Sequence, residues 1–233
     1  MTLAVIGDIH ATWDNLGPVL ERVRRERVDG ILVVGDLGAN EFGLLARAAP
    51  DTVRNYRESA AEALRRVRSL GVPVLWVPGN HDPRDLAGEG NVDGRVSTVA
   101  GLRVAGIGGA GPDRYGFAYE WDEDEILARA VPECDVFLCH APPRWTPIDM
   151  VGRAVHAGSD AIRRCAERHR GVLVCGHIHE APGFARIGEC LCMNVGGLGP
   201  PYGRPQVGFV RGMDELGHED LASGTRQRLL RQG

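Results

Sequence analysis

Short, continuously apolar runs alternate with longer amphipathic stretches over about the first third of the chain. The runs cover residues 3–6, 31–34 and 74–77, and each has a glycine within two positions of its end. Runs of this length and composition are typical of strands that are buried on both faces. Between them, residues 13–27 and 52–70 repeat apolar side chains at helical spacing. This order predicts a β-α-β-α-β unit and α/β layering around a largely parallel sheet.

In the rest of the chain the hydrophobic pattern predicts shorter elements, separated by loops rich in glycine and proline. The expected elements are a hairpin over residues 96–99 and 102–107, a helix over 122–130, a strand over 135–139, a helix over 159–168 and a strand over 172–175. Residues 108–121 and 141–158 are expected to be loops, and residues 176 to about 213 are expected to form strands with turns.

The chain contains no linker and no internal repeat, so the sequence predicts a single domain over residues 1–223. Residues 224–233 carry three arginines and are expected to be a short basic tail, either a frayed helix or disordered.

Composition and charge narrow the classes of function. The formal net charge is −4, so nucleic acid and anionic membranes are not expected partners, and a phosphate-bearing substrate must be attracted locally. The basic residues are all arginine, which excludes a Schiff-base lysine and the lysine of a nucleotide-binding P-loop. The six cysteines form no C-x-x-C pair, and the N-terminus does not resemble a secretion signal, so a cytoplasmic location is expected.

Polar side chains suited to binding metal follow five of the predicted strands. They are Asp8 and His10, Asp36, Asn80, His140, and His177 and His179. Ligands of an α/β sheet bind at the carboxyl ends of its strands, so these side chains are expected to converge.

The donor types favour a pair of divalent cations. Asp8 and His10 are two residues apart, as are His177 and His179, so in an extended chain each pair points to one side. Asp36 has two carboxylate oxygens and can bridge two ions, and Asn80 adds a neutral oxygen. Mixed nitrogen and oxygen ligands suit manganese, iron or zinc better than calcium. Two such ions about 3.5–4 Å apart are a recurrent device for phosphate ester hydrolysis.

At these residues the chain resembles the calcineurin-like metallophosphoesterases, whose motifs are D-x-H, G-D, G-N-H-D/E, H and G-H-x-H. The resemblance runs from Asp8 to His179 and implies a four-layer αββα sandwich with two mixed sheets. It also implies that Asp8, His10, Asp36 and His179 hold one metal, that Asp36, Asn80, His140 and His177 hold the other, and that His81 is the catalytic proton donor. The chain is most similar to small prokaryotic members, which share H-A-P-P at 140–143, H-x-G-S at 156–159 and a closing N-x-G at 194–196.

One motif departs from part of the superfamily. The protein Ser/Thr phosphatases carry G-D-x-V-D-R-G, whereas this chain has G-D-L-G-A-N at 35–40. The second aspartate, which usually assists the catalytic histidine, is missing, and Asn40 or Glu41 is a hypothetical substitute.

The expected function is hydrolysis of phosphate esters in small molecules, with phosphodiesters preferred, by hydroxide formed at two divalent metals. Manganese is the expected metal, with iron, zinc or nickel as alternatives. Two residues are candidates for substrate binding, namely His156 in the long loop and Arg114 beside Tyr115 and Phe117. A phosphomonoesterase acting on nucleotides or phosphoproteins, and a non-catalytic scaffold on the same fold, remain open. The sequence also leaves the oligomeric state open.

Overall fold

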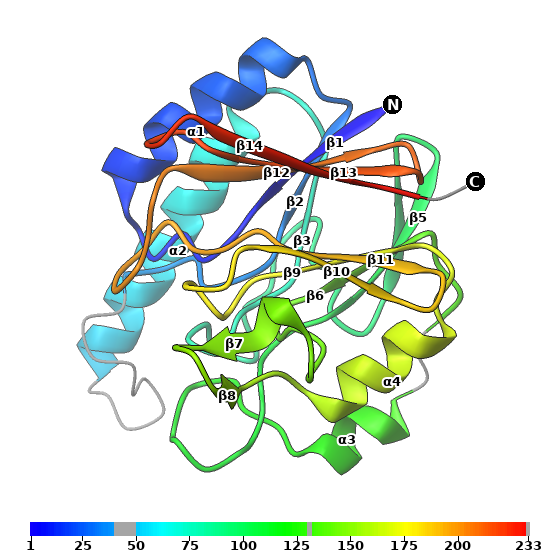
Figure 1. Ribbon diagram of the computed structural model, residues 1–233. Coiled ribbons are helices and arrows are strands. Elements are labelled where there is room, and N and C mark those ends of the chain that lie inside the picture. Colours follow the sequence, from blue (N-terminus) through cyan, green and yellow to red (C-terminus); the bar gives the residue numbers. More distant parts are fainter. Residues whose placement is uncertain (40–49, 130–131, 232–233) are drawn as a thin grey trace.

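The computed structural model describes residues 1–39, 50–129 and 132–231. Two six-stranded sheets pack face to face, and a pair of helices covers the outer face of each sheet (Figure 1). The predicted four-layer αββα sandwich with mixed sheets is confirmed.

The first sheet has the strand order β14-β13-β12-β1-β2-β3. Its strands are β1 (Thr2–Ile6), β2 (Gly30–Val33), β3 (Val74–Trp76), β12 (Gln206–Arg211), β13 (Glu215–Asp220) and β14 (Thr225–Leu230). The central strands β1, β2 and β3 are parallel, as their apolar runs predict, and β12 to β14 extend the sheet in antiparallel fashion. The sheet is therefore mixed rather than largely parallel.

The second sheet has the strand order β10-β11-β9-β6-β5-β4. Its strands are β4 (Val96–Val99), β5 (Leu102–Ile107), β6 (Val136–Cys139), β9 (Val172–Cys175), β10 (Gly183–Ile187) and β11 (Cys190–Asn194). The expected hairpin is β4 and β5, and β5, β6, β9 and β11 run parallel.

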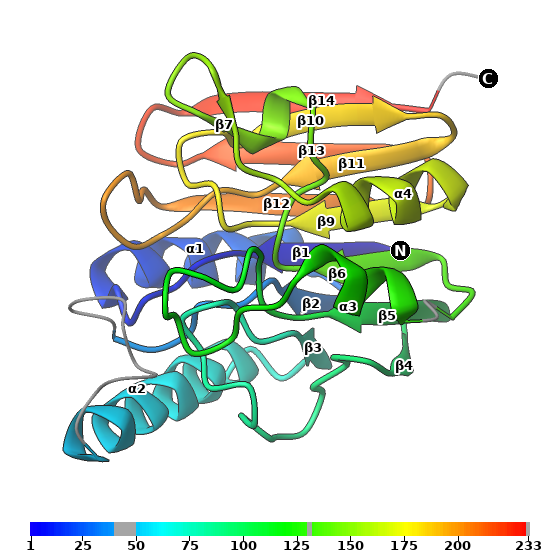
Figure 2. The ribbon, with the colours of Figure 1, turned by 90° about the horizontal axis from the view of Figure 1, so that it is seen from below.

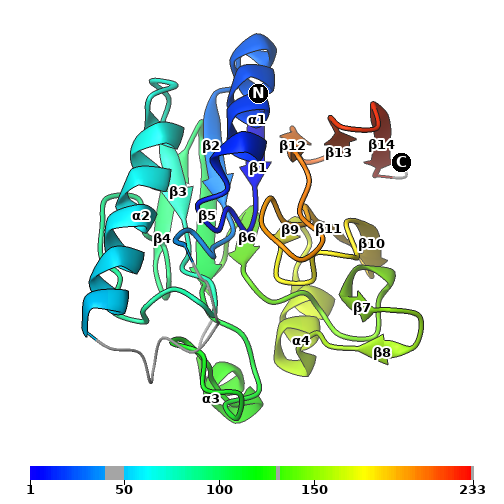
Figure 3. The same cartoon turned by 90° about the vertical axis from the view of Figure 1, so that its left-hand side faces the viewer.

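Four helices form the outer layers (Figure 3). They are α1 (Trp13–Glu26), α2 (Pro50–Arg68), α3 (Glu123–Ala128) and α4 (Asp160–Arg168). Helices α1 and α2 cover the first sheet, and α3 and α4 cover the second. Ser159 caps α4 as expected, because its hydroxyl accepts a hydrogen bond from the backbone N–H of Ile162. None of the described helices is long and apolar enough to cross a membrane.

Three apolar cores follow from this layering. The middle core lies between the sheets and consists largely of valine and leucine, such as Val34, Leu138 and Val174. The other two lie between each sheet and its helices. Because the central strands are buried on both faces, both sheets are fixed from either side and can hold the loops at their ends in place.

The prediction for the C-terminal residues is wrong. Residues 225–230 form β14, which pairs with β13 along its whole length, from Glu215 opposite Leu230 to Asp220 opposite Thr225. Neither a frayed helix nor a disordered tail includes this strand pairing. In the paired strand, Leu229 packs against the core between the sheets.

The long loop at 141–158 also contains more structure than the sequence indicated. A 3₁₀ turn at Pro147–Asp149 leads into the short strands β7 (Met150–Val151) and β8 (Val155–His156), which form a small hairpin. Figure 2 shows this hairpin beside the second sheet.

Candidate metal centre

The seven predicted ligands converge between the two sheets. Asp8, His10, Asp36 and Asn80 follow β1, β2 and β3 of the first sheet, whereas His140, His177 and His179 follow β6 and β9 of the second. Two groups of side chains bring potential ligand atoms within 4.8 Å of one another, namely Asp8 with His10 and His179, and Asp8 with Asp36 and His140. Both sheets are therefore needed to assemble the cluster.

Asp36 lies at the centre of the cluster and is buried. Its Oδ2 atom is 3.5 Å from Nε2 of His10 and 3.4 Å from Nε2 of His140. Its Oδ1 atom accepts a hydrogen bond from the backbone N–H of His81 at 2.9 Å. One carboxylate thus faces histidines from both halves of the predicted ligand set, which is the geometry that a bridging ligand needs.

The amide oxygen of Asn80 faces two imidazoles, lying 2.9 Å from Nε2 of His140 and 3.0 Å from Nδ1 of His177. Nδ1 of His140 lies 2.6 Å from the carbonyl oxygen of Val34, which fixes the proton of a neutral ring on that nitrogen. The lone pair of His140 Nε2 then points toward other acceptors. A proton on His140 Nε2 or a metal ion must lie between these acceptors, and the set of imidazole, carboxylate and amide donors fits a metal ion.

Burial and charge shift the pKa values in a consistent way. Burial lowers the pKa of His10 to about 4 and that of His177 to about 3, which keeps both rings neutral and able to bind a metal. Burial acts in the same sense on His140, but the Asp36 and Asp8 carboxylates outweigh it and raise its pKa to about 9. Burial alone would raise the pKa of Asp36, but the surrounding histidines hold it well below its usual range. The cluster therefore favours positive charge at its centre.

Four of the candidate ligands have a strained backbone. The φ angles of Asp8, His10, Asp36 and His177 are 43°, 45°, 51° and 67°, in the left-handed region that residues with a Cβ rarely adopt. Strain of this kind is maintained where the surrounding structure imposes it, and it is concentrated at functional sites.

Two glycines are required by close approach to the carboxylates. A Cβ atom at Gly79 would lie 2.0 Å from Oδ1 of Asp36, and one at Gly176 would lie 2.1 Å from Oδ2 of Asp8. Glycine, which has no Cβ, lets the chain pass this close to the two carboxylates.

His81, the predicted proton donor, lies at the rim of the cluster. Its Nε2 atom is 3.9 Å from Oδ2 of Asp36, and its ring packs against Phe117 with centroids 4.5 Å apart. Its Nδ1 atom is buried and has no hydrogen-bond partner among the described residues. The proposed substitutes for the missing aspartate, Asn40 and Glu41, lie outside the described residues.

Asp82 is a site residue whose role the sequence did not reveal. Its buried carboxylate accepts hydrogen bonds from the N–H groups of Leu37 and Gly79 and from the hydroxyl of Tyr56. It therefore ties the loop that carries Asp36 to the loop that carries Asn80. Burial and the nearby Asp36 raise its pKa to about 6. It belongs to the G-N-H-D motif, but two of its three partners, Leu37 and Tyr56, lie far away in the sequence.

Asn194 supports the H-x-H loop in a comparable way. Its side-chain amide donates to the carbonyl oxygens of Ile178 and Ile148, and its oxygen accepts from the N–H of Gly196. Ile178 stands between His177 and His179, so Asn194 holds the pair in place. The closing N-x-G motif was the signal for this residue.

The two predicted substrate-binding residues do not contact the seven ligands within the described structure. Arg114 is exposed, donates to the hydroxyl of Tyr115 and lies over its ring. Nδ1 of His156 lies 2.7 Å from Oδ1 of the buried Asp149, and its ring packs against Trp145. Arg114 belongs to the loop at 108–121, whereas His156 lies on β8 of the small hairpin.

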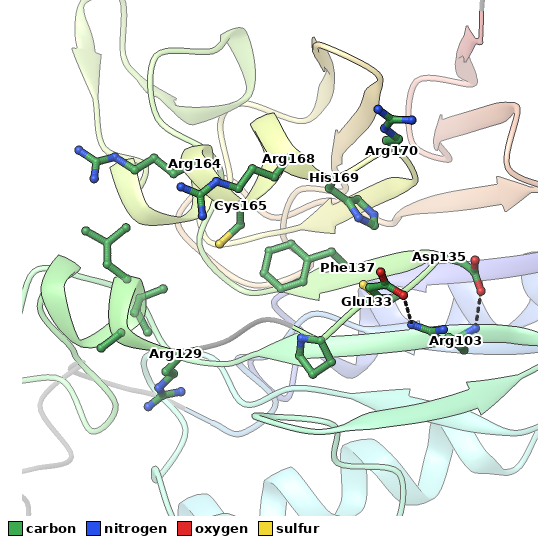
Figure 4. A pocket seen from close by; sticks show the side chains of 15 residues that line it. Arg103, Arg129, Glu133, Asp135, Phe137, Arg164, Cys165, Arg168, His169 and Arg170 are labelled. Carbon is green, nitrogen blue, oxygen red and sulfur yellow. Dashed lines mark hydrogen bonds and ion pairs between the residues drawn. The ribbon is translucent and has the colours of Figure 1, made fainter.

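Two cavities differ in their relation to the cluster. A cavity of about 470 Å³ borders His179 and is lined by polar residues that include Tyr202, Arg204 and His218. A cavity of about 840 Å³ lies between α3 and α4 (Figure 4). Its walls include Arg103 and Asp135, at the starts of β5 and β6, so it lies at the opposite end of the sheet from the ligands.

Comparison with known proteins agrees with this geometry. A model of the calcineurin-like phosphoesterase family matches residues 1–181. The chain belongs to this family. The match spans all seven ligand candidates and His81, and so confirms the resemblance of the sequence motifs.

Among curated proteins, an uncharacterised protein of Methanocaldococcus jannaschii is 28% identical over 211 residues, which cover 83% of this chain and 87% of that protein. A symmetrical bis(5'-nucleosyl)-tetraphosphatase of Sodalis glossinidius is 40% identical over 88 residues, but these cover only 37% of this chain and 26% of that enzyme.

Among solved structures, a protein of Thermus thermophilus matches with a TM-score of 0.58 at 16% identity over 99% of both chains. Yfce, a phosphoesterase from E. coli, matches with a TM-score of 0.55 at 18% identity over the whole of both chains. These two similarities establish the shared fold.

Proposed function

We propose that this protein hydrolyses phosphate esters, preferably phosphodiesters, with a hydroxide formed between two divalent cations. The observation that carries the proposal is the position of Asp36, whose Oδ2 atom faces His10 on one side and His140 on the other. This placement suits a carboxylate shared by two ions. Membership of the calcineurin-like phosphoesterase family supports the same reaction class.

The proposed ligands divide into two overlapping sets. Asp8, His10, Asp36 and His179 hold one ion, and Asp36, Asn80, His140 and His177 hold the other. The mixture of imidazole, carboxylate and amide donors favours manganese, with iron, zinc and nickel as alternatives.

The reaction combines the two ions with groups of the chain. Bound ions of this kind lower the pKa of a water molecule to near neutrality and stabilise charge on the phosphoryl oxygens. His81, at the rim, protonates the departing alkoxide. Burial lowers the pKa of His81, which makes its protonated form a stronger acid.

The proposed substrates are small phosphate esters that enter from the loop side of the cluster. The cavity of about 470 Å³ beside His179 offers space for a second ester substituent, which favours diesters. The partial similarity to bis(5'-nucleosyl)-tetraphosphatases supports a nucleotide substrate as an alternative. Arg114 and His156 are proposed to contact parts of the substrate that are remote from the phosphorus. The proposed location of the protein is the cytoplasm.

A direct test measures metal content and hydrolysis together. The purified protein, loaded with Mn²⁺, is expected to bind about two ions per chain and to cleave bis(p-nitrophenyl) phosphate faster than p-nitrophenyl phosphate. The variant Asp36→Asn should lose both bound metal and activity. The matched control Asp85→Asn removes an exposed carboxylate that pairs with Arg57 and should retain both. A metal-free, inactive wild-type protein would instead favour the non-catalytic scaffold.

The role of His81 can be tested separately. His81→Ala should retain the metals, because the residue is not among the proposed ligands. It should lose about 10²-fold or more in rate on esters of poor leaving groups such as alkyl alcohols, and far less on nitrophenyl esters, whose leaving group needs no proton. Equal losses on both kinds of ester would contradict the donor role.

A further inference from the structure

The loop at 112–120 connects solvent with the rim of the cluster through a row of stacked groups. The guanidinium of Arg114 lies 5.1 Å from the ring centroid of Tyr115, and Tyr115 lies 6.4 Å from Phe117. Phe117 in turn lies 4.5 Å from His81. Tyr115 is 54% exposed and Phe117 is half-buried, so the row presents aromatic surface to anything that reaches His81 from outside.

Hydrogen bonds fix the conformation of this loop. The buried Glu120 carboxylate accepts hydrogen bonds from the N–H groups of Tyr115 and Gly116, at 3.1 Å and 2.7 Å. The N–H of Tyr119 donates to the carbonyl oxygen of the proposed ligand Asn80 at 3.0 Å, and its hydroxyl donates to Asp93 at 2.7 Å. The aromatic row is thus anchored directly to the metal centre, and its rings are held in place before a substrate arrives.

We infer that Phe117 and Tyr115 form a binding surface for the leaving group of the substrate, and that this leaving group carries a planar aromatic ring such as a nucleobase. The inference rests on the proposed function, in which His81 donates a proton to the departing oxygen. That oxygen must lie within hydrogen-bond reach of His81, and a group attached to it is then within reach of Phe117.

This surface is suited to stacking against a planar leaving group rather than to recognising a specific pattern of hydrogen bonds. Phe117 offers only its ring, and Tyr115 offers a ring whose hydroxyl already accepts from Arg114. Aromatic side chains bind bases of any kind through their faces, so the surface selects a planar group without selecting one base. A nucleoside 5'-phosphodiester represents this substrate class, with cleavage at the bond between phosphorus and O5'. Water supplies the new P–O bond, and the proton from His81 goes to O5', so that the free nucleoside is released.

A matched pair of substrates isolates the base. Adenosine 5'-methylphosphate and the same diester with a methoxy group in place of adenine have the same leaving oxygen. With the Mn²⁺-loaded protein we expect kcat/KM for release of the nucleoside to exceed that for the base-free diester by about tenfold, because one base stacks on an aromatic ring. Chromatography separates this route from release of methanol.

Variants of the loop distinguish stacking from support of His81. Phe117→Leu keeps an apolar contact with His81 but removes the aromatic face, and Tyr115→Ala removes the outer ring. Both should reduce the preference for the base-bearing diester toward unity, because kcat/KM for that diester falls more than kcat/KM for the base-free diester. Tyr202→Ala is the matched control, since Tyr202 is also 54% exposed but lies beside the cavity that borders His179. It should keep the full preference.

The outcomes separate this inference from the function on which it rests. Equal kcat/KM for the two diesters in the wild-type protein, or an equal loss on both in Phe117→Leu, overturns the leaving-group surface and leaves the phosphoesterase intact. Activity on nitrophenyl diesters without activity on either ribose diester also overturns it. A metal-loaded protein that is inactive on every ester removes the proposed function and this inference together.

Discussion

Asp82 illustrates how one buried carboxylate can organise two loops of a site. Three donors converge on it, and each comes from a different segment of the chain, at Leu37, Tyr56 and Gly79. None of these pairings can be inferred from the spacing of G-N-H-D, because two of the partners are distant in sequence. The convergence of the candidate ligands could be predicted, since they follow five apolar strands whose ends meet.

We expect Asp82→Asn to lower the free energy of unfolding by about 1–3 kcal/mol, because one buried N–H group would then face an amide N–H₂ instead of an oxygen. Tyr56→Phe removes a single hydrogen bond and should cost about 1 kcal/mol. Urea denaturation of the metal-loaded proteins measures both changes. A fully stable Asp82→Asn protein would contradict the role assigned to this carboxylate.

His218 has polar neighbours in the sequence, which predict a surface position, but it is only 5% exposed, and its Nε2 atom lies 3.2 Å from the carbonyl oxygen of Val195. Its neighbours on β13 are polar because they alternate across the strand, which a local reading of composition does not reveal. Burial lowers its pKa below 6.5, and the hydrogen bond to Val195 and the Asp220 and Glu219 carboxylates only partly offset this.

This lowered pKa predicts a pH dependence of stability. Between the folded pKa and 6.5 the unfolded chain binds more protons at this residue, so stability is lost as the pH falls through this window. We expect His218→Gln, which can still donate to Val195, to reduce that loss by up to about 1.4 kcal/mol per pH unit. Urea denaturation at pH 7 and pH 5.5 checks this. If the free energy of unfolding changed equally with pH in the variant and in the wild type, the predicted contribution of His218 would be contradicted.

At the scale of elements, the buried strands were the easiest to predict and the edge strand was the hardest. The runs that became β1, β2, β6 and β9 are apolar throughout, because both faces of each strand are covered. β14 reads T-R-Q-R-L-L and is exposed along most of its length, so its sequence alone resembles a solvated tail. Its pairing with β13 is a tertiary interaction that local pattern does not encode.

Arg231, directly after β14, joins the two sheets. Its guanidinium donates to the carbonyl oxygens of Met213 in the first sheet's β12–β13 turn, and of Glu189 and Gly171 next to strands of the second sheet. We expect Arg231→Ala to lower the free energy of unfolding by about 1–2 kcal/mol, because three charge-assisted hydrogen bonds are lost from a partly exposed position.

Arg228→Ala is the control for this prediction. Arg228 lies on β14 and is exposed, so its removal should change stability by no more than about 0.5 kcal/mol. Thermal unfolding of the two variants side by side provides the measurement. Equal losses of stability in the two variants would show that the hydrogen bonds from Arg231 do not stabilise the C-terminal end.

At the scale of the whole molecule, the order of the motifs was enough to predict the four layers, once the resemblance to the family was recognised. Apolar periodicity alone indicates only a largely parallel sheet. The sequences of the antiparallel strands β12 to β14 do not reveal which strand of the sheet they pair with. The approach of His140 and His177 to Asn80 likewise depends on how the sheets face each other, which the spacing within one segment does not determine.

Metal binding should stabilise the whole domain, since the ligands come from both sheets. Mn²⁺ at about 100 times its Kd should add about 2.7 kcal/mol to the free energy of unfolding, which corresponds to a rise in Tm of roughly 5–10 °C for a domain of this size. Differential scanning calorimetry with Mn²⁺ and with EDTA measures this shift. Asp36→Asn should show little of it, and an unchanged Tm in the wild-type protein would contradict metal binding by the native fold.

The origin of the donors in two separate sheets has a consequence for the order of events during maturation. An intermediate with only the first sheet in place would offer Asp8, His10, Asp36 and Asn80 but none of the later histidines, and the second sheet alone would lack every carboxylate. A complete coordination sphere first exists when the two halves dock. Uptake of the second ion should therefore coincide with the last step of folding, and newly made chains should become active only after that step.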